Sequence, residues 1–159
     1  MRVRPVALLL VAILLFAGTA QAIAADEPDR EVVTLLAMIN AEREQAGLRP
    51  LALSPELNGV AAAHAHDMID NDFFAHNSPT TGTPAHRAKL AGVSFTKLGE
   101  NLCGNVSVDA AHQLLMASPT HKANILDPKY DKVGLAVVHG SKYGLIVVEM
   151  FIQSPDSGK

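Results

Sequence analysis

The fold is decided by residues 133–152, which read VGLAVVHGSKYGLIVVEMFI. Two mostly apolar runs, residues 133–138 and 145–152, flank a polar segment with two glycines, and this pattern predicts a β-hairpin whose loop is longer than two residues. The second run is apolar on both alternating faces, apart from Glu149. Since such a strand is covered on both sides, we expect an α/β protein, an α-β-α sandwich with a small, mainly antiparallel sheet.

The segments before the hairpin carry helix signals. Apolar residues recur at helical spacing over residues 31–46, and Ser54-Pro55-Glu56 is typical of a helix start. That second helix is predicted to run to about residue 71. The remaining expectations are a loop over 73–83, a short helix between Thr83 and Gly92, a short strand within 93–102 that is broken at Gly99, and helical segments over 109–118 and 121–125.

Residues 1–24 have the pattern of a secretory signal peptide. Arg2 and Arg4 precede an apolar run that is too short for a membrane span, and small residues follow it. We therefore expect a signal peptide (1–24), a short linker (25–30), one compact domain (31–153) and a flexible tail (154–159). The mature protein is expected to be secreted or periplasmic, with no stable membrane anchor after the signal is removed.

The charge balance argues against nucleic acid as a partner. The chain has 13 Lys and Arg against 16 Asp and Glu, and the expected signal removes two arginines and no acid. A mildly acidic domain has no general attraction to nucleic acid or to anionic lipid. The single cysteine, Cys103, cannot form an internal disulfide, so packing must hold the fold together, and we expect a monomer.

The histidines differ in their surroundings. His64 and His66 lie close in sequence, but residues two apart on a helix point about 200° apart and cannot share a metal. His64 falls on the apolar face of its helix and is predicted to be a hydrogen-bonded core or boundary histidine. His76 instead follows Phe73 and Phe74 in a loop, where the two aromatic rings can anchor the loop and fix the direction of the imidazole.

Three other titratable side chains stand among small or apolar residues. Glu100 follows a glycine beside an apolar segment, and is either buried and paired or exposed at a strand end. Glu149 interrupts an apolar face, where a buried carboxylate needs a partner such as a histidine or a metal; a strand kink or a wet gap is the alternative. His121 follows Ser118 by three residues on a helical turn, so these two side chains are neighbours.

These residues belong to short sequence motifs that follow one another in a characteristic order along the chain. The motifs are Asn40-x-x-Arg43, Ala61-x-x-His64-x-x-Asp67-Met68, Phe74-x-His76, Arg87, Gly99-Glu100-Asn101 and Ser118-x-x-His121-x-x-Asn124-Ile125-Leu126. Their order resembles that of bacterial CAP domains, whose superfamily also contains the cysteine-rich secretory proteins, antigen 5 and the plant pathogenesis-related proteins. The resemblance covers about residues 32–152 and implies an α-β-α sandwich.

The resemblance also implies a central cavity lined by histidines and acids, which in some eukaryotic members holds a divalent metal such as zinc. Its expected lining here is His76, Glu100, Asn101, Ser118, His121 and Glu149. His76 and His121 are the candidate metal ligands, and no cofactor is expected to be required. Glu149 stands where bacterial relatives usually carry glutamine, so the ligand set departs from the family pattern and zinc is expected to bind weakly.

Convergence of these groups on one cleft would have an electrostatic consequence. Carboxylates beside imidazoles favour the protonated imidazole, so we expect the cleft histidines to hold protons more tightly than free histidine. Glu149 is expected at the floor or edge of the same cleft.

Three classes of function are compatible with these residues. The resemblance favours a non-catalytic binding module whose cavity holds a lipid, a cell-wall fragment or a protein partner. The first alternative is a metal-dependent hydrolase with His76 and His121 as ligands and Glu100 as general base. The second is a metal-free hydrolase built on Ser118 and His121, which lacks a Gly-x-Ser-x-Gly context. Cys103 is favoured as a small buried hydrophobe over a nucleophile.

We predict that the mature protein begins between Ile23 and Asp26, because small residues at the expected cleavage positions precede this segment. N-terminal sequencing of exported protein measures this directly. Recovery of intact Met1 in the membrane fraction would contradict it.

Overall fold

The structure, a computed structural model, describes residues 30–155. The expected signal peptide, nearly all of the linker and residues 156–159 of the expected tail lie outside the described residues. Within residues 30–155, no helix is long and apolar enough to cross a membrane.

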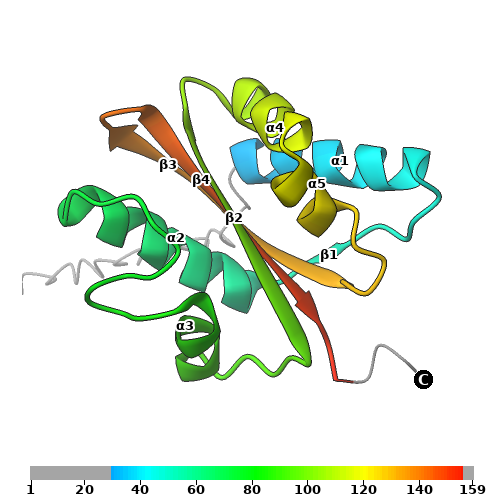
Figure 1. Cartoon of the computed structure of the whole chain (residues 1–159), viewed down its shortest axis with the longest axis horizontal. Coiled ribbons are helices and arrows are strands. Elements are labelled where there is room, and N and C mark those ends of the chain that lie inside the picture. The colour runs from blue at the N-terminus through cyan, green and yellow to red at the C-terminus, as the bar shows by residue number, and fades with distance from the viewer. Residues whose placement is uncertain (1–29, 156–159) are drawn as a thin grey trace, which may run out of the picture.

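Five helices and four strands are described, in the order seen in Figure 1. They are α1 (Arg30–Gln45), β1 (Ala52–Leu53), α2 (Pro55–Asp70), α3 (Pro84–Leu90), β2 (Lys97–Asn105), α4 (Val108–Ala117), α5 (Pro119–Ile125), β3 (Lys132–Ser141) and β4 (Gly144–Gln153). The strands form one sheet in the order β1-β3-β4-β2, with β1 parallel to β3 and the other neighbours antiparallel. The predicted α/β sandwich with a mainly antiparallel sheet is confirmed.

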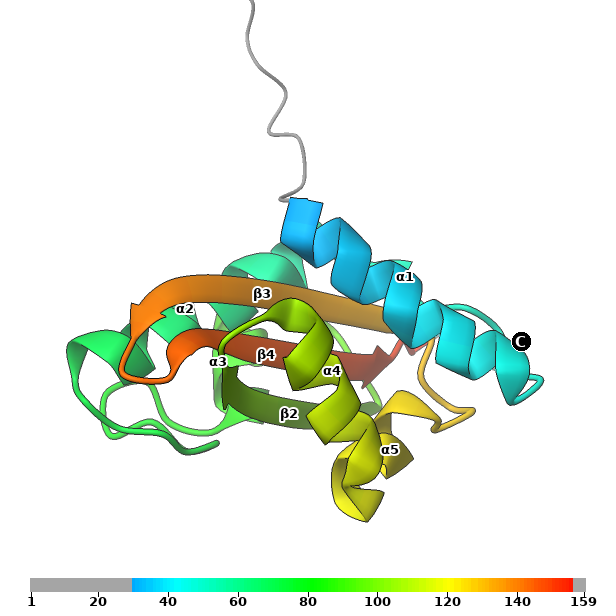
Figure 2. The same ribbon diagram turned by 90° about the horizontal axis from the view of Figure 1, so that it is seen from above.

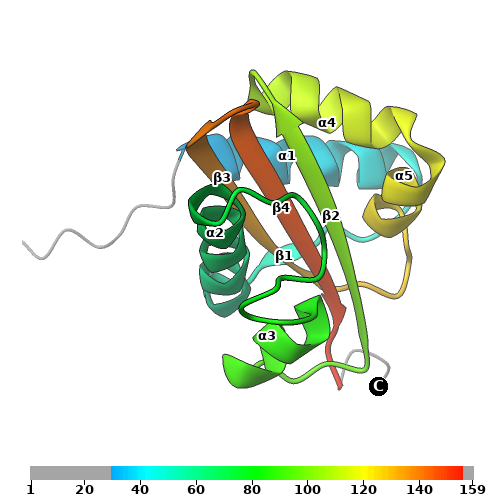
Figure 3. The same cartoon turned by 60° about the vertical axis from the view of Figure 1, so that its left-hand side comes forward.

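Helices cover both faces of the sheet, as expected from the two apolar faces of β4. Figure 2 shows α1, α4 and α5 on one side of the strands, and Figure 3 shows α2 and α3 beside the other. Val147 and Phe151 of β4 pack into the core under α1 and α4. Val148 and Met150, which alternate with them, pack into a separate core under α2.

The helix starts follow the local sequence. The Ser54 hydroxyl accepts a hydrogen bond from the Leu57 N–H, and the Thr83 hydroxyl accepts one from the His86 N–H. A proline follows each of these caps in the first helical turn. The capping side chains satisfy backbone donors that have no partner inside the helix, so the two predicted starts are confirmed.

Two expectations about strands were wrong. Strand β2 continues through Gly99 and pairs with β4 over its full length. The glycine is needed for another reason: a Cβ there would lie 2.5 Å from the Tyr130 hydroxyl and 2.9 Å from Asn124 Oδ1. The hairpin loop is also shorter than predicted, because Ser141 pairs with Gly144 after a register shift at Gly140, which has a φ of 96°.

Arg43 fixes the C-terminal end of α5 from inside the protein. Its side chain is fully buried, and Nη1 donates to the carbonyl oxygens of Ile125 (2.7 Å) and Asp127 (3.0 Å). A buried guanidinium is costly without such acceptors, and the backbone carbonyls at a helix end lack partners inside the helix. The contact therefore sets the position of α5, the helix that carries His121 and Asn124.

We predict that Gly134→Ala strongly destabilises the protein. A Cβ at Gly134 of β3 would overlap the backbone and side chain of Leu57 in α2, so the two layers would have to separate. Overpacking of this kind costs about 1–3 kcal/mol, and more where backbone must move. The matched control is Gly59→Ala on the exposed face of α2, where a Cβ meets nothing within 4 Å. This substitution should raise the free energy of unfolding by up to about 1 kcal/mol. Urea denaturation measures both; equal stability of the two variants would contradict this packing.

Candidate functional site

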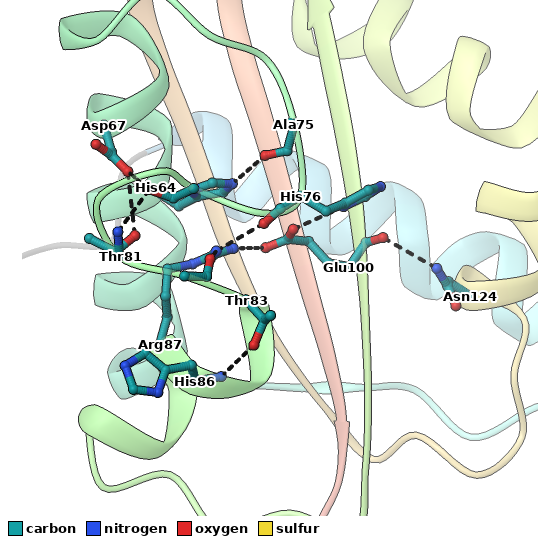
Figure 4. A network of polar contacts seen from close by, with 12 residues as sticks. His64, Asp67, Ala75, His76, Thr81, Thr83, His86, Arg87, Glu100 and Asn124 are labelled. Carbon is teal, nitrogen blue, oxygen red and sulfur yellow. Dashed lines mark hydrogen bonds and ion pairs between the residues drawn. The ribbon is translucent and has the colours of Figure 1, made fainter.

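Glu100 lies at the centre of a buried polar cluster. Its carboxylate accepts a hydrogen bond from His76 Nδ1 at 2.9 Å and forms an ion pair with Arg87 Nη2 at 2.6 Å (Figure 4). The Glu100 side chain is 2% exposed and the Arg87 side chain 5% exposed. We call His76, Arg87 and Glu100 the Glu100 cluster. It joins a loop, helix α3 and strand β2.

Arg87 and Asp67 hold the loop that carries His76. Arg87 Nη1 donates to the carbonyl oxygens of His76 (2.9 Å) and Gly82 (2.8 Å). The Asp67 carboxylate accepts hydrogen bonds from the hydroxyls of Ser78 and Thr80. The loop is therefore tied to α2 through one acid and to α3 through one base, and this fixes the backbone from which His76 projects.

His64 secures the same loop from α2. Its Nε2 donates to the Ala75 carbonyl at 3.0 Å, and the residue has no exposed surface. Burial, followed by the positive charge of Arg87, lowers the pKa of His64 to about 4. His64 is thus a neutral, hydrogen-bonded core histidine, as the helical pattern predicted.

His76 is the exposed member of the Glu100 cluster. Its side chain is 52% exposed, and Nδ1 is engaged by Glu100. Because a carboxylate only accepts hydrogen bonds, Nδ1 carries the proton and the neutral ring presents Nε2 as an acceptor. Burial raises the pKa of Glu100, while the contacts with Arg87 and His76 oppose that rise. The cluster thus presents an oriented imidazole at the surface.

A second polar cluster surrounds Glu149 on β4. The residue has no exposed surface, and its Oε2 accepts a hydrogen bond from Asn101 Nδ2 at 2.9 Å. Asn124 Nδ2 in turn donates to Asn101 Oδ1 at 2.8 Å. We call Asn101, Asn124 and Glu149 the Glu149 cluster. Oε1 of Glu149 has no partner among the described residues, and burial raises the pKa of Glu149 to about 7.

The two clusters lie on opposite faces of the sheet. Glu100 pairs across β2 and β4 with Met150, and Asn101 pairs with Glu149. Successive residues of a strand point to opposite faces, so Glu149 shares a face with Asn101 and not with Glu100. The expectation that Glu149 forms the floor or edge of the Glu100 cleft is therefore wrong. The clusters are joined through neighbouring residues of β2 and through Asn124, whose Nδ2 also donates to the backbone carbonyl of Glu100 at 3.4 Å.

His121 lies on α5, where it is partly buried. Asn101 Nδ2 donates to its backbone carbonyl at 3.1 Å. Burial lowers the pKa of its imidazole, and the charge of His76 lowers it further. The expectation that the cleft histidines hold protons more tightly is thus wrong for His121, because no hydrogen bond or ion pair joins a carboxylate of residues 30–155 to its ring. His76 and His121 lie near enough to repel each other when protonated.

The side chain of His121 helps to line an apolar pocket with a volume of about 280 Å³. The other lining residues are Phe74, Leu102, Cys103, Gly104, Leu114, Leu115 and Tyr143. Phe74 and Tyr143 meet edge to face with ring centroids 5.5 Å apart, and both are partly exposed. Tyr143 lies so close to Gly104 that a Cβ there would fall 2.8 Å from its ring. We call this the apolar pocket.

Ser118 does not pair with His121. It ends α4 and begins α5, and its hydroxyl lies 3.1 Å from the Thr120 hydroxyl. Among residues 30–155 no hydrogen bond joins the Ser118 and His121 side chains, so a serine activated by this histidine has no support in the geometry. Cys103 is a buried free thiol, and burial raises its pKa. It therefore resembles a small hydrophobic side chain more than a reactive nucleophile.

A tightly held metal does not fit the residues present. Within the part of the chain that the structure describes, no three His, Cys, Asp or Glu side chains are placed to hold one ion. His76 and His121 remain as two imidazoles, and both oxygens of Glu100 are engaged by His76 and Arg87. Zinc sites in proteins use at least three side chains.

Several site residues were not singled out from the sequence. The available signal for three of them was their place in the sequence motifs quoted above: Arg87, Asp67 and Asn124. Tyr143 lies in the hairpin turn and joins Phe74 only through the tertiary fold. No local pattern pointed to it.

The comparisons with known proteins agree with this architecture. The sequence profile of the cysteine-rich secretory protein family (CAP) matches residues 36–151. YkwD of Bacillus subtilis (strain 168) is 35% identical over 125 residues, which cover 78% of this chain and 46% of that protein. The membrane protein YlbC of the same organism is 31% identical over 104 residues, or 65% of this chain and 30% of that protein. The chain thus spans less than half the length of these curated relatives.

Solved structures share the fold. An extracellular protein with an SCP domain from Bacillus anthracis str. Ames is 29% identical with a TM-score of 0.71, over 78% of this chain and 40% of that chain. An outer surface protein of Borrelia burgdorferi is 22% identical with a TM-score of 0.74, over 80% of this chain and 96% of that one. The second likeness concerns the fold alone.

We predict that Glu149→Gln stabilises the protein at alkaline pH but not at acidic pH. The folded-state pKa is raised from 4.5 to about 7, so the folded state binds this proton more tightly than the unfolded chain. Stability from this group is therefore present below pH 4.5 and is lost as pH rises to about 7, by on the order of 3 kcal/mol. Glutamine mimics the protonated acid and keeps the acceptor for Asn101.

Urea denaturation at about pH 4.5 and about pH 8 measures the effect. The difference between Glu149→Gln and wild type should be small at the lower pH and large at the higher one. Glu44→Gln, on the exposed face of α1, is the matched control and should show no such trend. A difference that does not depend on pH would contradict a buried, titrating Glu149.

Proposed function

The chain belongs to the cysteine-rich secretory protein (CAP) family, and from this premise we propose that it is a secreted, non-catalytic binding module. The ligand binds beside His76, with an apolar part in the apolar pocket and a polar group at the imidazole. A lipid or a cell-wall fragment has this combination of groups, as does a protein partner that presents an apolar side chain next to a polar group. No cofactor is required for this role.

The observation that carries the proposal is the engagement of Glu100. A general base must be able to reach the proton that it removes. Glu100 is inaccessible, and its two oxygens are already bonded to His76 and Arg87. The acid therefore serves to orient His76, and the group left for a ligand is the Nε2 atom of that ring.

The position of the apolar pocket also supports a binding role. Phe74 is two residues before His76, and His121, which senses the charge of His76, lines the same pocket. Concave, mostly apolar surfaces with a few placed polar groups are typical of ligand sites. The pocket and the imidazole together provide apolar contact and one directed hydrogen bond.

Secretion is supported by the N-terminal pattern and by the relatives. The Bacillus anthracis protein is described as extracellular, and the Borrelia burgdorferi protein as an outer surface protein. Residues 1–24 carry the basic start and the apolar run of a signal peptide.

Native mass spectrometry of exported protein tests the binding role. Wild type should retain a co-purifying ligand, and His76→Ala should lose it, because one lost hydrogen bond weakens binding by about tenfold. The matched control is His66→Ala, which removes an exposed histidine of α2 and should leave occupancy unchanged.

Two outcomes would contradict the proposal. One is hydrolysis of the co-purifying ligand that depends on His76. The other is stoichiometric zinc in the exported protein, with loss of the metal in His76→Ala. Equal ligand occupancy in His76→Ala and wild type would exclude His76 from the site while leaving the family assignment intact.

A further inference from the structure

Strand β2 lies at the edge of the sheet. The strand order is β1-β3-β4-β2, so β4 is the only neighbour of β2 among the described strands. Figure 2 shows β2 as the outermost strand, with α4 and α5 beside it. An edge strand carries main-chain N–H and C=O groups that point away from the sheet and can pair with another chain. The outer edge of β2 is thus a candidate interaction surface.

Alternation along β2 identifies the residues whose main-chain groups point outward. In an antiparallel pair, each residue directs both its N–H and its C=O either at the partner strand or away from it, in alternation. The Glu100 carbonyl accepts a hydrogen bond from Asn124 Nδ2 of α5 at 3.4 Å, so Glu100 is directed away from β4. The register with β4 continues without a shift to Asn105. Leu102 and Gly104 therefore also direct their main-chain groups outward.

The ladder on the other side of β4 gives the same alternation. The Val133 carbonyl of β3 accepts a hydrogen bond from the Ser54 N–H at 2.8 Å, so Val133 is directed away from β4. Its partner Phe151 is therefore directed at β2, where it stands opposite Gly99. Since Gly99 faces β4, Glu100 and every second residue after it face outward.

The outward groups of Gly104 are accessible in the apolar pocket. Gly104 lines the pocket and is partly exposed, and a glycine has only main-chain atoms to present. Among residues 30–155 its N–H has no hydrogen-bond partner, and its C=O meets only the Cys103 thiol, at 3.8 Å. Leu102 lines the same pocket, whereas Asn124 covers the edge at Glu100. The open part of the edge is therefore residues 102–104.

This open segment lacks the features that protect most sheet edges. Proteins shield edge strands with lysine, with proline or with a bulge. The segment consists of Leu102, Cys103 and Gly104, and its pairing with β4 is regular. An unprotected edge that opens into a pocket is typical of sites that bind an extended peptide by adding it as a strand.

Apolar and aromatic groups flank the open edge on both faces of the sheet. Successive side chains of an added strand would point to these two faces in turn. On one face Cys103 belongs to the core that contains Leu115 of α4. On the other face a Cβ at Gly104 would lie 2.8 Å from the ring of Tyr143, which meets Phe74 edge to face. The surroundings of the edge therefore suit a segment with apolar side chains.

We propose that the partner of this protein is an extended polypeptide segment, which adds to the outer edge of β2 as a strand. Gly104 exchanges main-chain hydrogen bonds with the segment, and an apolar side chain of the segment enters the apolar pocket. A lipid chain in the pocket would cover the N–H and C=O of Gly104 without bonding them, which is unfavourable. The inference rests on the proposed binding function and names the class of partner for it.

Peptides with methylated main-chain nitrogens test the strand addition. The probe is a capped heptapeptide that alternates threonine and valine; in two variants, the nitrogen of the central valine or of the next threonine carries a methyl group. Neighbouring residues of an added strand direct their N–H groups alternately at β2 and at solvent. One variant should therefore bind about tenfold or more weakly than the parent peptide, and the other within about threefold of it. Calorimetric titration measures all three affinities.

Hydrogen exchange locates the added strand. In the free protein the Gly104 amide should exchange faster than the Cys103 amide, because Cys103 is directed at β4. Saturation with the parent peptide should slow the exchange of Gly104 by about tenfold or more, while Cys103 changes little. Cys103 thus serves as the control within the same strand.

A variant of the pocket wall tests the side-chain contact. Leu114→Ser shortens an exposed leucine of α4 that lines the apolar pocket, and it should weaken binding of the parent peptide by about fivefold or more. Leu90→Ser shortens an exposed leucine of α3 that does not line this pocket, and it should bind the peptide like wild type. Circular dichroism verifies that both variants are folded.

Several results would overturn the inference. Equal binding of the two methylated peptides would mean that main-chain pairing is not recognised. A Gly104 amide that is protected in the free protein, or unprotected with peptide bound, would exclude pairing at this edge. Wild-type binding by folded Leu114→Ser would place the peptide outside the pocket.

Absence of binding by the parent peptide would also overturn strand addition. If the exported protein still loses a co-purifying lipid or glycan in His76→Ala, the proposed binding module stands without a peptide partner. Failure of the inference is thus distinguishable from failure of the proposed function.

Discussion

The pairing of β2 with β4 is the constraint on which the rest of the polar architecture depends. It places Glu100 and Asn101, two neighbouring residues, on opposite faces of the sheet. Glu100 holds Arg87 of α3 and the loop at His76, whereas Asn101 holds α5 through the His121 carbonyl and contacts Glu149. A shift of one residue in this pairing would exchange the two faces and break both clusters.

The two buried carboxylates show how surroundings decide the charge. Both Glu100 and Glu149 are removed from water, and burial raises the pKa of each. Glu100 is compensated by the cationic Arg87, so it can remain ionised and orient His76. Among the described residues Glu149 is bonded only to the neutral amide of Asn101, and burial raises its pKa to about 7. A buried acid with a cation positions its neighbours, and a buried acid without one costs stability at alkaline pH.

Local patterns were sufficient for most of the fold. The caps at Ser54 and Thr83 predicted two helix starts, and the two apolar faces of residues 145–152 predicted layers on both sides of the sheet. Strand β2 was predicted as broken because glycine weakens strands locally. The actual role of Gly99 is to let Tyr130 and Asn124 approach the strand, and this role depends on tertiary contacts that no local pattern contains.

The candidate site was predicted less completely, for a related reason. The order of the short motifs brought His76 and Glu100 together correctly, and the hydrogen bond between them confirms that contact. Alternation within a strand shows which of its residues share a face, but it does not give the register with the neighbouring strand. Glu149 was therefore predicted on the face of Glu100, whereas it pairs with Asn101 on the opposite face. Arg87 lies on a short helix next to Lys89, and nothing in that local sequence distinguishes a buried base from a solvated one.

Glu100 fixes His76 as a surface acceptor at Nε2. The tautomer of the His76 ring tests this most directly, measured by long-range proton–nitrogen NMR at alkaline pH in wild type and in Glu100→Gln. We expect a proton on Nδ1 in the wild-type ring, and a loss of that preference in the variant. A wild-type ring protonated on Nε2, or the same mixture of tautomers in both proteins, would contradict it.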